Sequence, residues 1–154
     1  MHLRFLALLV TLASLLFLGA CSGEAKDTHP DQPVTKRKAI FKQFTKTLEP
    51  IGMVARGRKD YKQPEFNASA VELQRLSSQP WSLFSADSNY PPTLAKAAVW
   101  AQPGEFKQAQ DRFQSAVASL VLASQGSDMN RIKTAVEQVQ GSCKGCHDEF
   151  RNER

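Results

Sequence analysis

The sequence predicts an all-α protein that folds as an antiparallel four-helix bundle. Apolar residues recur at spacings of three and four in four separate segments, and the alternating pattern typical of strands is essentially absent. Four amphipathic helices of this kind bury their apolar sides against one another, and the core of such a bundle is a natural cofactor site. The last of the four segments leads directly into a Cys-x-x-Cys-His motif near the end of the chain.

The first helix is predicted to begin at about Val34. Pro50 lies inside it and should kink the helix or end it one turn early, because proline cannot donate the backbone hydrogen bond. A second helix should start near Asn67, its N-cap, and run to about Ser78 before Pro80 stops it. The apolar stripe of the first helix consists of Phe41, Phe44, Leu48 and Ile51.

A long irregular segment, Trp81 to Pro103, precedes the third helix. It contains both tryptophans and should wrap the domain with its aromatic side chains turned inward, with a short helical turn around 94–99. The third helix should open after Gly104 and end at Gly126, and Asp128 can cap a fourth. The stripes are Phe106, Ala109, Phe113, Ala116 and Leu120 in the third helix, and Ile132, Ala135, Val139, Cys143, Cys146 and Phe150 in the fourth.

The motif Cys143-Lys144-Gly145-Cys146-His147 is the attachment signature of a c-type haem. Two thiols add to the porphyrin vinyl groups, and the adjacent histidine supplies an axial iron ligand. A redox Cys-x-x-Cys pair is expected near a βαβ pattern, whereas the sequence here is helical. A zinc site would need further Cys or His ligands, and none remains after residue 30. The motif therefore predicts one covalently attached haem c near the C-terminus of the fourth helix.

The chain begins with a short basic stretch, Met1 to Arg4, and an apolar run from Phe5 to Ala20. The run is short for a membrane span of about 20 residues and is typical of a signal peptide. Its end, Leu18-Gly19-Ala20-Cys21, resembles the lipobox of bacterial lipoproteins, in which the cysteine is acylated. The alternative is ordinary secretion with Cys21 as a free thiol. We expect a periplasmic protein whose Cys21 lipid anchors it to a bacterial membrane.

Three regions follow from this organisation: a lipoprotein signal peptide at 1–20, a lipidated cysteine with a flexible tether at 21–33, and the bundle at 34–154. Without the signal peptide the chain has 19 basic and 15 acidic residues, a net charge of +4. This excess is expected to be spread along the chain, which gives nucleic-acid binding little support. We expect this positive charge to lie on a solvated surface; the alternatives are that it attracts acidic redox partners or anionic membranes.

Several short sequences, in order, resemble the class II cytochromes c and within them the cytochromes c′. The resemblance covers about Val34 to Arg151, and a haem motif at the extreme C-terminus of a helical chain is itself uncommon. The matching pieces are Arg37 four residues before Phe41, Ala55-Arg56-Gly57, the Gln-Pro-Trp-Ser-Leu-Phe sequence of 79–84, Trp100 ahead of Phe106-Lys107-Gln108, and the Cys-Lys-Gly-Cys-His-Asp-Glu-Phe-Arg sequence of 143–151.

The resemblance implies a role for each site residue. Cys143 and Cys146 would carry the haem thioethers, and His147 would be the proximal iron ligand. Arg151, one turn later on the same helix, resembles the proximal arginine beside that imidazole; the alternative is a cation facing the helix dipole. Arg37 resembles the arginine that meets a haem propionate, where a guanidinium suits a carboxylate. The alternative for Arg37 is a solvated surface charge.

Phe41 stands where low-spin members of the class carry a methionine ligand and where cytochromes c′ carry an apolar residue that leaves the sixth site empty. Met53 lies about 18 Å farther along a straight helix, and Met129 lies about 27 Å from His147 by the same rise. His29 sits in the tether and could reach the iron only by folding back. We therefore expect a five-coordinate iron with Phe41 over its distal face.

A vacant iron site behind a phenyl ring should disfavour oxygen and carbon monoxide, because haem ligands are selected by polarity and steric access. The resemblance implies nitric oxide binding, with loss of the His147 bond as one outcome, and we expect a capture and protection role. No catalytic constellation appears elsewhere, so a turnover enzyme is not expected. The alternative is an electron carrier between membrane-associated redox proteins. Many family members are dimers through their first two helices.

Overall fold

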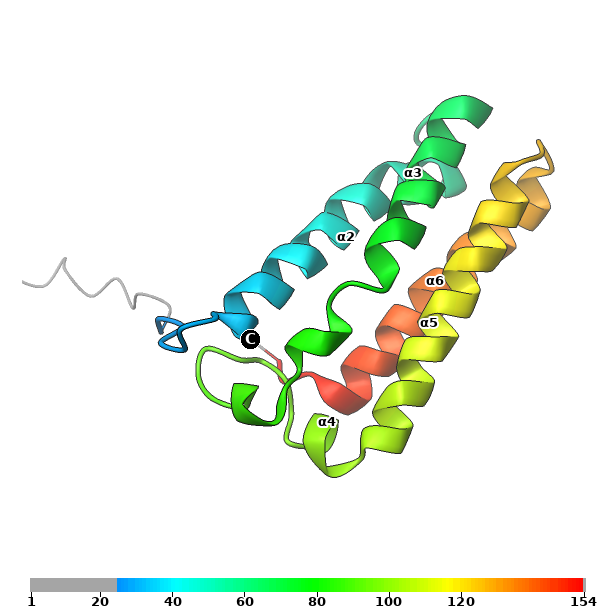
Figure 1. Cartoon of the computed structure of the whole chain (residues 1–154). Helices are drawn as coiled ribbons and strands as arrows, with labels where there is room; N and C mark the ends of the chain where they lie inside the picture. Colours follow the sequence, from blue (N-terminus) through cyan, green and yellow to red (C-terminus); the bar gives the residue numbers. More distant parts are fainter. Residues whose placement is uncertain (1–24, 154) are drawn as a thin grey trace, which may run out of the picture.

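The computed structural model describes residues 25–153, and four long helices make up most of it (Figure 1). Helices α2 and α3 lie together opposite α5 and α6, and consecutive long helices run in opposite directions (Figure 1). The predicted all-α bundle is confirmed, and within 25–153 the only β-type pairing is an isolated bridge between Ala95 and Arg151. The long helices are α2 (Pro33–Ala55), α3 (Gln63–Ser77), α5 (Pro103–Ser124) and α6 (Met129–Phe150).

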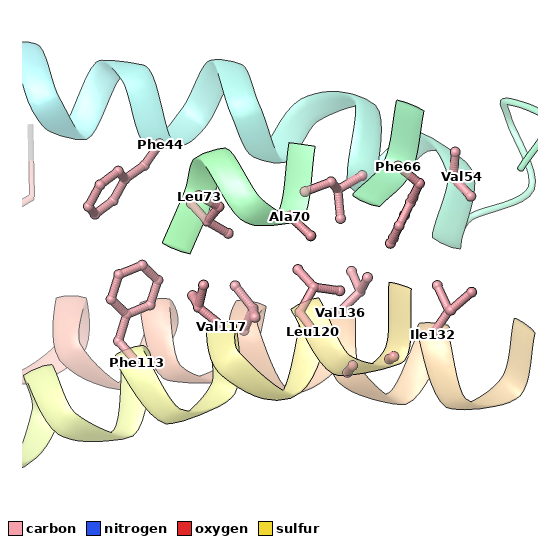
Figure 2. Packing of buried hydrophobic residues seen from close by; sticks show 14 of the residues in the cluster. Phe44, Val54, Phe66, Ala70, Leu73, Phe113, Val117, Leu120, Ile132 and Val136 are labelled. Atoms are coloured by element: carbon pink, nitrogen blue, oxygen red, sulfur yellow. The ribbon is translucent and has the colours of Figure 1, made fainter. Parts of the chain in front are cut away.

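The main core is formed where the two helix pairs face each other. Figure 2 shows Phe44 opposite Phe113 at one end and Val54 near Ile132 at the other, with Leu73 and Val117 between them. Burial of such side chains contributes about 1.5–3 kcal/mol each, so the stripes of the four helices hold the bundle together. A second, smaller cluster contains Val99, Phe106, Ala109 and Phe150.

Two predicted boundaries differ from the structure. Helix α2 continues through Pro50 to Ala55, because burial of Ile51 and Val54 in the core outweighs the backbone hydrogen bond that Pro50 cannot donate. Helix α3 begins at Gln63, with Pro64 in its first turn, where a missing N–H costs nothing. Asn67 is therefore no N-cap, and its side-chain amide instead donates to Ser124 Oγ at 2.8 Å.

The other helix ends follow the sequence closely. Helix α5 ends at Ser124, two residues before Gly126, and Asp128 caps α6 by accepting from the backbone N–H groups of Asn130 and Arg131. The irregular segment between α3 and α5 contains two 3₁₀ turns, η2 (Trp81–Leu83) and η3 (Ala86–Ser88), and the short α4 (Ala98–Ala101). Its turns lie at the end of the bundle where α6 finishes (Figure 1).

Residues 27–32, within the predicted tether, make defined contacts with the segment after η2. Asp27 accepts hydrogen bonds from Tyr90 Oη and from the backbone N–H of Thr35. His29 Nε2 lies 3.2 Å from Asp87 Oδ2, and its ring stacks on Tyr90. The predicted signal peptide and Cys21 lie outside the described residues. Within 25–153 no helix has both the length and the apolar character needed to cross a bilayer.

Candidate haem site

The two motif thiols lie on the inward side of α6, as the sequence predicts. Cys143 and Cys146 are free and half-buried, and their spacing of three puts them on one side of the helix. Cys143 packs against the main core, and Cys146 packs against the second cluster. Burial raises the pKa of both thiols, for Cys146 to about 11 with help from Cys143 and Glu149. An apolar group bonded to both thiols would therefore contact both the main core and the second cluster.

His147 follows Cys146 directly and is exposed in the last turn of α6. At about 100° per residue it lies roughly 40° around the helix from Cys143, so the imidazole stands beside the thiols. Desolvation lowers the pKa of His147, and the nearby positive charge of Arg151 lowers it further. Both effects favour the neutral imidazole, which is the form that binds a metal.

Arg151 is not on the helix, which corrects the sequence prediction. It is the C-cap residue, with φ −128° and ψ 132°, and its backbone N–H donates to the carbonyl of His147 at 3.1 Å. The chain turns out of the helix here because it pairs with 94–96. Lys96 N donates to Phe150 O at 2.9 Å, and Asn152 N donates to Leu94 O at 2.8 Å. The placement of its guanidinium beside the haem stays a prediction.

Arg37 is buried, with 3% of its surface exposed, so the alternative of a solvated charge is wrong. Its guanidinium donates to Leu83 O at 2.7 Å, to Ser88 Oγ at 2.8 Å and O at 3.1 Å, and to Thr93 Oγ1 at 2.7 Å. It also lies 4.4 Å from the centroid of the Phe84 ring. Arg37 thus holds the whole 83–93 segment against α2.

The contacts of Arg37 with 83–93 were not predicted from the sequence, although one feature of the sequence indicates that Arg37 is buried. Arg37 lies three residues after Val34 and four before Phe41, so it falls on the apolar stripe of α2. All of its hydrogen-bond acceptors are neutral, and no carboxylate in 25–153 forms an ion pair with it. Desolvation lowers the pKa of Arg37, opposed by the more distant Tyr90 and Asp27. A buried charge without a counter-ion fits a site that receives an anion.

Phe41 is half-buried at the centre of an aromatic cluster. Its ring meets Phe44, Trp81 and Phe84 edge to face, with centroids 5.4, 6.1 and 6.3 Å away. Phe106 continues the cluster toward α6, since its ring centroid lies 5.1 Å from that of Phe84 and 5.2 Å from that of Phe150. The sequence predicts that the aromatic side chains of the irregular segment turn inward, but not that Trp81 and Phe84 contact Phe41.

The residues present fit a c-type haem by their chemistry. Two thiols and an imidazole come from one helix end, an aromatic wall suits a flat macrocycle, and a buried guanidinium without a counter-ion suits a propionate. Among residues 25–153 no three or more His, Cys, Asp or Glu side chains gather to hold a bare metal ion. An all-helical bundle with this motif at its last helix defines a bundle-type c-type cytochrome.

Comparison with known proteins gives the family. A family model described as Cytochrome C′ matches residues 32–151. A cytochrome c′ of Cereibacter sphaeroides is 33% identical over 152 residues, which are 96% of this chain and 97% of the relative. The crystal structure of cytochrome c′ from Rubrivivax gelatinosus, 29% identical, matches with a TM-score of 0.76 and covers 82% of this chain and all of its own. The chain belongs to the cytochrome c′ family and carries a covalently attached c-type haem.

Solved relatives include complexes with diatomic gases. A nitric oxide complex of a cytochrome c′ variant from Alcaligenes xylosoxidans is 26% identical, with a TM-score of 0.77, and covers 83% of this chain and all of its own. A carbon monoxide complex of another variant of that protein matches equally well. Binding of diatomic ligands is thus recorded for haem proteins that share this fold.

Proposed function

We propose that this protein captures nitric oxide at a vacant iron position covered by Phe41. Cys143 and Cys146 would hold the haem through thioether bonds, His147 would ligate the iron, and Arg37 would meet a propionate. The haem supplies an iron that binds small diatomic molecules. The chain supplies the pocket, and Phe41 is the observation that carries the proposal, because a phenyl ring at the centre of an aromatic cluster has no atom that can ligate iron.

The positions of other potential ligands support a five-coordinate iron. Met53 lies near the end of α2, and Met129 opens α6 at the opposite end from His147, about 27 Å away by helical rise. His29 is hydrogen-bonded to Asp87 and stacked on Tyr90. Each of these side chains would have to leave its present position to approach the iron.

The character of the distal surroundings supports nitric oxide as the ligand. Phe41, Phe44 and Phe84 offer no hydrogen-bond donor, and the Trp81 indole N–H is already donated to Ser77 O at 2.7 Å. Such a pocket gives little stabilisation to bound oxygen, and the ring of Phe41 obstructs the approach to the iron. Nitric oxide binds ferrous haem strongly enough to displace the ring. We propose binding without turnover, in the periplasm, by a protein anchored through the Cys21 lipid.

Competitive binding to the ferrous protein tests this proposal. We expect one nitric oxide per haem at low micromolar gas, with carbon monoxide bound more slowly and oxygen not retained. Rapid and tight oxygen or carbon monoxide binding would contradict the proposed selectivity. Failure of every gas to bind would favour the electron carrier, whose iron has both axial positions filled.

A further inference from the structure

Helix α2 carries the net positive charge of the folded chain. It contains five basic residues and one acidic residue, Glu49, for a net charge of +4. The whole chain is +5, and Arg4 accounts for the remaining unit, so the charges outside α2 sum to zero. Residues 56–62 add four basic residues and one acidic residue, and acidic residues in the other segments offset this +3. The positive excess therefore gathers in residues 33–62, of which α2 is the larger part, and this corrects the expectation that it is spread along the chain.

Most of this charge faces outward. Arg37 is buried, whereas Lys36, Lys42 and Lys46 are exposed, and Lys38 is half-buried. At about 100° per residue, the lysines lie on the half of α2 turned away from the core stripe. In residues 25–153, Lys36, Lys42 and Lys46 take part in no ion pair. We call these three lysines the α2 basic face.

The basic face is unfavourable for the helix itself. Within this face Lys42 and Lys46 are four residues apart, where like charges repel. At the N-terminal end of α2 the Asp27 carboxylate accepts from the backbone N–H of Thr35, but it forms no ion pair with the three lysines. Within residues 25–153 no ion pair offsets the repulsion between Lys42 and Lys46, and this unfavourable arrangement points to an external anionic partner.

The short spacer to the proposed lipid anchor identifies that partner. Asp27 is held by Tyr90 and by Thr35 in the first turn of α2, so only Ser22 to Lys26 separate Cys21 from the folded domain. Six residue steps span at most about 20 Å. The N-terminal end of α2 would therefore stay near the membrane surface, where anionic lipids attract basic residues.

We propose that the α2 basic face binds anionic phospholipid headgroups and orients the bundle on the membrane. The inference rests on the proposed lipid anchor for its geometry, but the binding itself needs only the lysines. Phosphate groups at the surface would complement the three unpaired ammonium groups, while the opposite pair α5 and α6 would face away from the membrane (Figure 1).

Vesicle binding by unacylated mature holoprotein tests this proposal independently of the anchor. The protein carries Cys21→Ser and is secreted behind a signal peptide that leaves no lipid. We expect sedimentation with phosphatidylcholine vesicles that contain phosphatidylglycerol, no sedimentation with phosphatidylcholine alone, and release in 0.5 M salt. Lys36→Gln, Lys42→Gln and Lys46→Gln together should weaken binding at least about tenfold.

The matched control changes Arg58, Arg131 and Lys133 to Gln, which gives the same net charge from exposed positions outside α2 that also form no ion pair in residues 25–153. It should bind the anionic vesicles nearly as well as the parent protein. Equal losses in the two triple variants, or no preference for anionic vesicles, would overturn the proposal. So would an α2 triple variant that changes the oligomeric state but not vesicle binding, because the face would then join two copies.

Discussion

At the scale of single residues, Phe41 decides the coordination of the iron. We predict that Phe41→Met converts a mainly high-spin haem to a mainly low-spin one, because the thioether would fill the position that the ring covers. Phe41→Ala should keep the iron five-coordinate and speed carbon monoxide binding by about tenfold or more, which is a barrier change of about 1.4 kcal/mol. Absorption spectra measure the spin state, and flash photolysis measures the rate of carbon monoxide binding. Phe44→Ala is the control, since that ring is 6% exposed in the core and should alter stability more than spin state.

The two motif cysteines make a second prediction. Replacing Cys143 and Cys146 with serine should make the haem extractable by acidified solvent and lower the melting temperature, because His147 alone would then hold it. Haem that resists extraction from the double variant would show that the attachment lies elsewhere.

Arg37 shows how far single residues could be predicted from the sequence. The motif residues are identifiable because the chemistry of Cys-x-x-Cys-His is local, and α6 does place both thiols inward. The acceptors of Arg37 lie 46 to 56 residues away in an irregular segment, so no periodicity could reveal them. Arg151 was misplaced for the same reason, because its backbone pairs with Ala95.

At the scale of elements, the contacts of residues 27–32 should depend on pH. Desolvation raises the pKa of Asp27, but hydrogen bonds from Tyr90 and Thr35 outweigh it and lower the pKa from 3.8 to about 2. Because the folded pKa is depressed, this stabilisation is present above about pH 4 and is lost as the pH falls toward 2. Desolvation and the bond to Asp27 raise the pKa of Tyr90 to about 12.

Urea unfolding of the wild type and of Asp27→Asn measures this effect. The wild type should be more stable at pH 5, and the difference between the two proteins should shrink as the pH falls from 4 to 2. Asp31→Asn is the matched control, because the Asp31 carboxylate accepts no hydrogen bond in residues 25–153. A difference that stays constant over this range would contradict the assigned hydrogen bonds.

The presence of four long helices could be predicted from the sequence, but not all of their ends could. The four apolar stripes give four long helices because burial of a continuous stripe dominates, and Asp128 caps α6 through its own side chain. The expected early end of α2 at Pro50 and the expected N-cap at Asn67 are wrong, because tertiary contacts override both local rules. Pro50 stays helical beside buried Ile51, and Asn67 finds its partner in Ser124 on α5.

At the scale of the whole molecule, the anchor is a separate prediction. A labelled fatty acid should mark the wild-type protein and not Cys21→Ser. Persistent label in the variant, or a wild type that is fully soluble after cell disruption, would contradict the lipoprotein assignment. The gas-binding proposal would survive that result, since it depends on the bundle alone.

The spin state of the wild-type haem tests the central claim most directly. Absorption and electron paramagnetic resonance spectra of the ferric and ferrous protein at neutral pH distinguish five-coordinate from six-coordinate iron without any substitution. If the iron position covered by Phe41 is vacant, the haem should give high-spin spectra in both oxidation states, and the ferrous form should react with nitric oxide. A low-spin spectrum in both states would contradict it, because another side chain would then hold the sixth position, and electron transfer would become the favoured function.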